Sequence, residues 1–183
     1  MDWIGISVYN YDRTSRNQVA INKPDVFTNP NANQATETLF DRAHPFYPTY
    51  VTGKNKPFIF SETAAPIETN LPGNISYVQI QPTPQYELQV KQAWWRAIFA
   101  TALGPGAAMP KLKAVVWFEI TKPEQAYNTA SNSNNNNNVL RDYTVTTNRD
   151  VASALAADVK GYGNQMTYPG KFKFSCNGEW NNV

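Results

Sequence analysis

Three short apolar segments, each five to nine residues long, are spread along the chain. Residues 3–9 read WIGISVY, residues 57–62 read PFIFSE and residues 112–120 read LKAVVWFEI. In the first segment, β-branched residues occupy one face and small or polar residues the other, which is the pattern of a half-buried strand. We therefore predict a β-strand at each of the three segments.

Helical patterns follow the predicted strands. Residues 33–43 favour a short helix, and residues 86–104 (YELQVKQAWWRAIFATALG) form the clearest helical pattern, ended by the Gly-Pro-Gly of residues 104–106. Residues 148–160 predict a last helix with Asn148 as its N-cap. Short hydrophobic strands that alternate with helices indicate an α/β fold with a parallel sheet.

The ends of the predicted strands carry polar and aromatic side chains. In parallel sheets and in closed (β/α) barrels, ligands lie at the carboxyl ends of the strands. Tyr9, Glu62 and Trp117 would all lie at that edge. The alternation of the third strand assigns Trp117 and Glu119 to one face and Phe118 to the other. We therefore predict that Tyr9, Glu62 and Trp117 converge on one face of the sheet.

Two segments differ from the strand and helix patterns of the rest of the chain. Residues 128–138 (NTASNSNNNNN) predict a low-complexity loop. In the tail, residues 161–183, apolar residues alternate ahead of an Asn-Gly pair, which is typical of a small hairpin. We therefore divide the chain into a main portion, residues 1–160, and this tail.

Charge and composition exclude several kinds of partner and site. Sixteen basic and fourteen acidic residues give a formal net charge of +2, and the basic residues are scattered, so we expect no nucleic-acid partner and no membrane surface. No segment approaches the ~20 consecutive apolar residues that span a bilayer. The single cysteine, Cys176, excludes an internal disulfide framework, and the single histidine, His44, argues against a multi-histidine metal site and a Ser-His-Asp triad. We expect no metal and no other cofactor.

Glu62 is the candidate catalytic residue. Retaining cleavage of a glycosidic bond needs one carboxylate that attacks the anomeric carbon and a second carboxylic acid, about 5–5.5 Å away, that protonates the departing oxygen. A tyrosine hydroxyl can keep the attacking carboxylate ionised and oriented, and an aromatic face can stack on a sugar ring. Tyr9 and Trp117 supply these residue types. Two structural alternatives stay open: Glu62 caps a helix or pairs with Lys56 or another basic residue, and Trp117 is a core aromatic residue.

The blocks DWIGISVYNY, KPFIFSETAAP, and LKAVVWFEI followed by RDYTV resemble strands six, seven and eight of glycoside hydrolase family 26, whose members are retaining (β/α)8-barrel enzymes. The resemblance extends over about residues 2–160, in separate blocks. It implies an α/β fold that is a partial TIM barrel, made of the C-terminal strands and helices. It also implies that Glu62 is the nucleophile, that Tyr9 hydrogen-bonds to it, and that Trp117 forms the floor of a sugar subsite. The substrate implied is a polysaccharide, in most members a β-1,4-mannan, and no cofactor is implied.

One part of the family pattern is missing from this sequence. The acid/base of the family is a glutamate at the end of strand four, and the chain begins at what resembles strand six. We therefore expect this sequence to be the C-terminal part of a longer hydrolase, to supply the half that carries the nucleophile, and to be inactive alone. Glu119 is the candidate for a substitute acid or for a substrate-binding residue, because it lies two residues beyond Trp117 on the same predicted face.

Other functions and the location of the protein are also considered. A non-catalytic glycan-binding protein on a degenerate barrel and a self-contained α/β interaction module are the alternatives to a hydrolase. The sequence Asn74-Ile75-Ser76 is an N-glycosylation sequon, which agrees with a secreted protein. We expect an extracellular protein, with any signal peptide upstream of Met1. The oligomeric state stays open.

Overall fold

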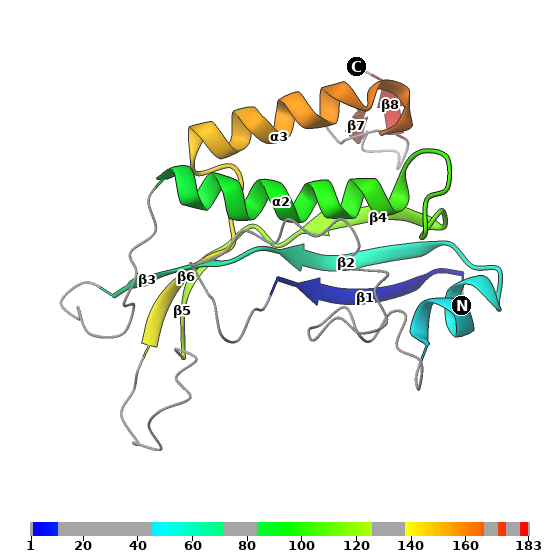
Figure 1. Cartoon of the computed structure of the whole chain (residues 1–183), viewed down its shortest axis with the longest axis horizontal. Coiled ribbons are helices and arrows are strands. Elements are labelled where there is room, and N and C mark those ends of the chain that lie inside the picture. The colour runs from blue at the N-terminus through cyan, green and yellow to red at the C-terminus, as the bar shows by residue number, and fades with distance from the viewer. Residues whose placement is uncertain are drawn as a thin grey trace.

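A parallel sheet of three strands forms the centre of the protein. The computed structural model describes residues 2–10, 45–71, 84–125, 138–166, 172–174 and 180–182. The strands β1 (Ile4–Tyr9), β2 (Phe58–Ala64) and β4 (Leu112–Trp117) lie in the order β1-β2-β4 (Figure 1). Both strand pairs are parallel, which confirms the predicted α/β class with a parallel sheet. The described strands form an open sheet, not a closed barrel.

The three predicted strands are present, although their ends are shifted. β2 continues past its predicted end, and β4 stops before its own. Between β1 and β2 the register changes: Ile6 pairs with Phe60, but the next residue, Ser7, pairs with Glu62. One extra residue of β2, Ser61, therefore lies between the two pairs, as in a β-bulge.

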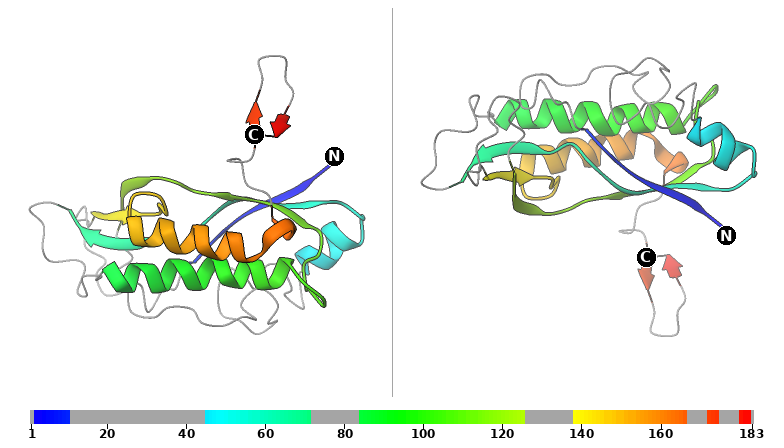
Figure 2. Two further views of the ribbon diagram at one scale, coloured as in Figure 1. Left: turned by 90° about the horizontal axis from the view of Figure 1, so that it is seen from above. Right: turned by 90° about the horizontal axis from the view of Figure 1, so that it is seen from below.

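Helices α2 (Pro84–Ala102) and α3 (Arg149–Gly161) lie on one side of the parallel sheet (Figures 1 and 2). Between α2 and the sheet lies a hydrophobic core whose buried members include Val8, Phe58, Phe60, Val90, Trp94, Ile98 and Leu112. Each large apolar side chain buried in this way contributes roughly 1.5–3 kcal/mol. The core therefore fixes which face of the sheet is turned towards the helices.

Both helices were predicted, and their ends have local causes. The chain leaves α2 through Gly104 and Gly106, whose φ angles of 87° and 79° are in the left-handed region that favours glycine. At the start of α3, the Asn148 side chain accepts hydrogen bonds from the backbone N–H groups of Asp150 and Val151. The predicted N-cap is thereby confirmed.

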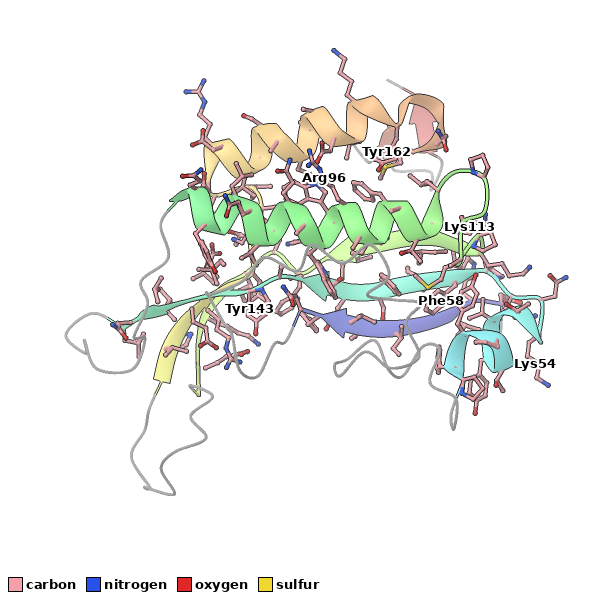
Figure 3. All side chains as sticks on the ribbon, in the orientation of Figure 1. Lys54, Phe58, Arg96, Lys113, Tyr143 and Tyr162 are labelled. Atoms are coloured by element: carbon pink, nitrogen blue, oxygen red, sulfur yellow. The ribbon has the colours of Figure 1, made fainter. Side chains whose placement is uncertain are left out.

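A carboxylate on α3 joins the two helices. Arg96 of α2, which Figure 3 labels, donates two hydrogen bonds to Asp158 of α3, Nε to Oδ2 at 2.8 Å and Nη2 to Oδ1 at 2.9 Å. The indole Nε1 of Trp95 donates to the same Oδ2 at 2.8 Å. The bonds from Arg96 lower the pKa of Asp158, because they favour its ionised form.

A buried lysine joins α2 to Asp142 and to the segment that follows it. Lys91 Nζ donates to Glu87 Oε1 at 2.7 Å, to Asp142 Oδ2 at 2.9 Å and to the carbonyl oxygen of Thr144 at 2.5 Å. The Lys91 side chain has no exposed surface. The other oxygen of Glu87 accepts from Asn148 Nδ2 at 2.9 Å, which ties the network to the start of α3. The buried ammonium group is thus matched by two carboxylates and by a carbonyl oxygen.

A second sheet, which the sequence did not reveal, extends the first. β3 (Ile67–Asn70) follows β2, and β5 (Thr121–Gln125) follows β4. β6 (Asn138–Asp142) lies between them, antiparallel to both, in the order β3-β6-β5 (Figure 1). Residues 67–70, 121–125 and 138–142, for which no strand was predicted from the sequence, therefore form strands.

The remaining described elements are short. A π-helical turn, η1 (Tyr47–Thr52), precedes β2, and a 3-10 turn, η2 (Gly163–Gln165), follows α3. In the tail, β7 (Phe172–Phe174) pairs with β8 (Trp180–Asn182) in the antiparallel sense of a hairpin. Among the described helices, none is both long and apolar enough to cross a membrane.

Several sequence predictions fall outside the described residues. They concern the helix at 33–43, His44, the sequon at Asn74, the Asn-rich loop from 128 to 137, and Cys176. The division of the chain at residue 160 also stays a prediction.

The buried lysine network makes stability depend on pH. Burial raises the pKa of Asp142, but hydrogen bonds from Lys91 and Thr144 outweigh burial, so that the pKa is lowered in the folded state. A lowered pKa stabilises the fold above the unfolded-state pKa of about 4, and this stabilisation is lost as the pH falls through the folded-state value. We expect the free energy of unfolding, measured by urea titration from pH 6 to pH 2.5, to fall less steeply in Asp142→Asn than in the parent. Equal slopes would contradict this assignment.

Candidate functional site

Glu62 and Tyr9 meet at the carboxyl ends of two neighbouring parallel strands. Tyr9 Oη donates a hydrogen bond to Glu62 Oε2 at 2.8 Å. Ser7 Oγ lies 3.5 Å from the same oxygen, at the outer limit of a hydrogen bond. Glu62 is exposed, so its carboxylate is both oriented by the tyrosine and open to a ligand. The hydrogen bond between Tyr9 and Glu62 that the resemblance implied is thus present.

The bulge in β2 decides which face Glu62 occupies. Glu62 pairs with Ser7, whereas the next residue, Thr63, pairs with the buried Val8. Thr63 is itself buried, and its hydroxyl accepts a hydrogen bond from Trp94 Nε1 of α2 at 2.9 Å. Successive strand residues point to opposite faces. Thr63 therefore faces the helices, and Glu62 lies on the face of the sheet that α2 does not cover.

Trp117 lies on the opposite face from Glu62, so its predicted placement was wrong. It pairs with Thr63, and its ring packs edge-on against Trp95 of α2 with the centroids 6.3 Å apart. Its Nε1 donates to the carbonyl oxygen of Tyr143 at 2.6 Å. The apolar surface of the indole thus packs against Trp95, and its N–H group has a hydrogen-bond acceptor within the protein. The core reading of Trp117 fits this geometry, and the floor of a sugar subsite does not.

Phe118 and Tyr143 are two aromatic residues that pack against Tyr9. The ring of Tyr9 is 5.9 Å from that of Phe118 and 5.8 Å from that of Tyr143, and Phe118 and Tyr143 are 5.2 Å apart. All three contacts are edge-to-face, the arrangement that aromatic quadrupoles favour. We call these three residues the aromatic trio. The sequence placed Trp117 on the face of Glu62 and Phe118 on the opposite face. The structure shows the reverse, so the two faces of the third strand were interchanged in the prediction.

Glu119 is engaged by backbone donors of its own chain. Its carboxylate accepts hydrogen bonds from the backbone N–H of Val145 at 3.0 and 3.1 Å and from that of Thr146 at 2.8 Å. The hydroxyl of Thr146 bonds to it as well. These bonds hold the segment between β6 and α3. They give Glu119 a structural task, and its role towards a substrate stays a prediction.

A cluster of charges supports the aromatic trio from the second sheet. Arg141 bonds to Glu68 Oε1 at 2.7 Å and to Glu124, and Lys122 Nζ lies 2.7 Å from Glu124 Oε1. Tyr143 Oη donates to Glu124 Oε2 at 2.7 Å. Burial raises the pKa of Glu124, but the hydrogen bonds from Lys122, Tyr143 and Arg141 outweigh it and lower the pKa. We call Glu68, Lys122, Glu124 and Arg141 the ionic cluster.

The site combines an exposed carboxylate with a donor that fixes it. Such a carboxylate can attack an electrophilic carbon or accept hydrogen bonds from a sugar hydroxyl. Within the described part of the chain, no group of three or more metal-ligating side chains is gathered at a point. Sequence reasoning found Glu62 and Tyr9 but missed Phe118 and Tyr143, although Tyr143 lies within the quoted block RDYTV.

In comparisons with known proteins, no family model, no curated protein and no solved structure matches the chain.

Proposed function

We propose that this chain is the nucleophile-bearing part of a retaining β-glycoside hydrolase that cuts a plant or fungal polysaccharide, with β-mannan as the first candidate. In this proposal Glu62 attacks the anomeric carbon, and Tyr9 orients its carboxylate. The three parallel strands are three of the eight strands of a (β/α)8 barrel, with the α2 face outward. The protein acts outside the cell and needs no cofactor.

The hydrogen bond between Tyr9 and Glu62 is the observation that carries the proposal. A nucleophilic carboxylate must be ionised, held in one orientation and accessible to the sugar. Glu62 has the tyrosine donor at 2.8 Å, and it is exposed on the uncovered face. In a barrel that face is the interior, and its carboxyl end is where catalytic side chains gather.

The second carboxyl group belongs to another strand in this proposal. The proton donor of a retaining enzyme lies about 5–5.5 Å from the nucleophile. The family that the sequence resembles takes it from strand four. Glu119 is a poor substitute, because its oxygens are already bonded to Val145 and Thr146. The chain alone is therefore expected to lack turnover.

The test uses the protein expressed from its complete transcript, with β-1,4-mannan, β-1,4-xylan and mixed-linkage β-glucan as substrates. Proton NMR of the first product should show the β-anomer, because two inversions retain configuration. Glu62→Gln keeps the shape of the side chain and should abolish product formation. Glycan binding without hydrolysis by the parent protein would instead favour the non-catalytic glycan-binding alternative.

A further inference from the structure

The Tyr9 hydroxyl can orient Glu62 only if its own ring is held. Tyr9 lies at the end of β1, which is an edge strand of the described sheet. Its ring meets the edges or faces of Phe118 and Tyr143 at 5.9 and 5.8 Å. A rotation of the Tyr9 side chain away from Glu62 would break these two aromatic contacts as well as the hydrogen bond.

We propose that Tyr143 is a positioning residue for the reaction: it acts through Tyr9 to hold the Glu62 carboxylate in its attacking orientation. The inference rests on the proposed function of Glu62 as a nucleophile. It assigns a task to a residue on the segment after β6 that has no contact with the sugar in this scheme.

Tyr143 is suited to this task because its backbone, its hydroxyl and its ring are all held by contacts. The residue is buried, with 1% of its surface exposed. Its backbone N–H donates to the carbonyl of Ile120 at 3.0 Å, and its carbonyl oxygen accepts from Trp117 Nε1 at 2.6 Å. Its hydroxyl donates to Glu124 at 2.7 Å, and its ring contacts Phe118.

The ionic cluster fixes the position of Glu124, which accepts the hydrogen bond of the Tyr143 hydroxyl. Glu124 is held at the same time by Lys122 and Arg141, and Arg141 is held in turn by Glu68. Lys122 Nζ also lies 5.2 Å from the centre of the Phe118 ring and 5.8 Å from that of Tyr143, within the range of a cation–π contact. Contacts thus run from the β3-β6-β5 sheet through Tyr143 and Tyr9 to Glu62.

The reaction that isolates this effect is the formation of the glycosyl-enzyme from 2-deoxy-2-fluoro-β-mannosyl fluoride. The Glu62 oxygen bonds to C1 while the C1–F bond breaks and fluoride departs with the electron pair. No proton has to be supplied, so the rate reports on the nucleophile and not on the acid. The gluco-configured fluoride serves as the second probe for a glucan-cutting enzyme.

A double-mutant cycle on this inactivation rate separates positioning from general damage to the fold. In the parent protein we expect Tyr143→Leu to slow inactivation about tenfold, which is less than the roughly hundredfold loss that a misplacement by 1 Å can cause. In a Tyr9→Phe background, which has already lost the hydroxyl, we expect the same change to slow it less than about twofold. Tyr143→Phe keeps the ring but loses the hydroxyl bond to Glu124, so its rate should lie between those of the parent and Tyr143→Leu.

Two further variants control for loss of structure. Phe118→Leu removes a second ring contact of Tyr9 and should show the same dependence on Tyr9. If Tyr143→Leu fails to fold, Tyr143→Phe is measured in both backgrounds instead, and its slowing should disappear in Tyr9→Phe. Phe99→Leu removes a buried ring of α2 that contacts Tyr162, with centroids 5.3 Å apart, and should lower the melting temperature without slowing inactivation of the folded protein.

The possible failures point to different errors. Equal slowing by Tyr143→Leu with and without the Tyr9 hydroxyl would overturn the positioning role and leave Glu62 as the nucleophile. No inactivation of the parent by either fluoride would overturn the proposed function and this inference with it.

Discussion

In the protein expressed from its complete transcript, Glu62→Ala should lower turnover of an activated aryl β-mannoside by about a thousandfold or more, because the covalent step then has no nucleophile. Sodium azide should restore part of the rate. The small anion can occupy the space of the lost carboxylate and attack C1 as the aryl oxide departs. Azide then attacks C1 from the α-face of the sugar, the side on which Glu62 lies in the proposed reaction. The product should therefore be the α-mannosyl azide, which NMR identifies.

The configuration of the azide product distinguishes a nucleophile from an acid. If Glu62 were the proton donor, azide would react with the glycosyl-enzyme and give the β-azide instead. Glu119→Ala is the matched control, because this glutamate beyond the end of β4 is bonded to backbone N–H groups and takes no part in the proposed covalent step. Full turnover by Glu62→Ala without azide would reject the nucleophile assignment.

Lys91→Met should cost about 3–5 kcal/mol of unfolding free energy, the range for removing one partner of a buried ion pair. The methionine fills most of the lysine volume, but Glu87, Asp142 and the carbonyl of Thr144 each lose a donor. Urea denaturation at pH 7 measures the loss. The slope of unfolding free energy against urea concentration is compared between the variant and the parent.

Arg96→Met provides the matched control on the same helix. Arg96 also pairs with a carboxylate, Asp158, but 55% of the Arg96 side chain is exposed. Exposed ion pairs contribute about 0–1 kcal/mol, so the loss should be much smaller than for Lys91→Met. Similar losses in the two variants would mean that burial does not set the strength of the Lys91 contacts.

The parallel sheet and its two helices were predictable because local patterns determine them. The three apolar segments carry strand patterns that do not depend on distant partners, and Asn148 is a cap that acts within its own turn. Lys91 could not have been placed from sequence, because a buried lysine is stabilised by residues 51 and 53 positions away. Because Lys91 is buried, the sequence of α2 suggests a more polar exposed face than the folded helix has.

The second sheet was not predictable because its strands carry no apolar alternation. β5 reads TKPEQ, and its proline is tolerated because β5 is an edge strand. β6 reads NVLRD, and its Arg141 is buried only because Glu68 and Glu124 come from strands on both sides. Such pairing between charged residues far apart in the chain leaves no periodic signal.

At the candidate site, sequence reasoning found the pair and missed its support. Glu62 and Tyr9 could be identified because both lie at predicted strand ends, and neighbouring parallel strands bring their ends together. The face of Trp117 could not, because alternation states which residues share a face and not which face is covered. The contact with Trp95 decides that question in the folded protein.

The most direct test of the central claim is peptide mapping of the protein after inactivation by 2-deoxy-2-fluoro-β-mannosyl fluoride or its gluco counterpart. If Glu62 is the nucleophile, mass spectrometry should find the fluorosugar on the peptide that carries Glu62, and Glu62→Gln should remain unlabelled. A fluorosugar attached to a different residue, or equal labelling of Glu62→Gln, would contradict the claim.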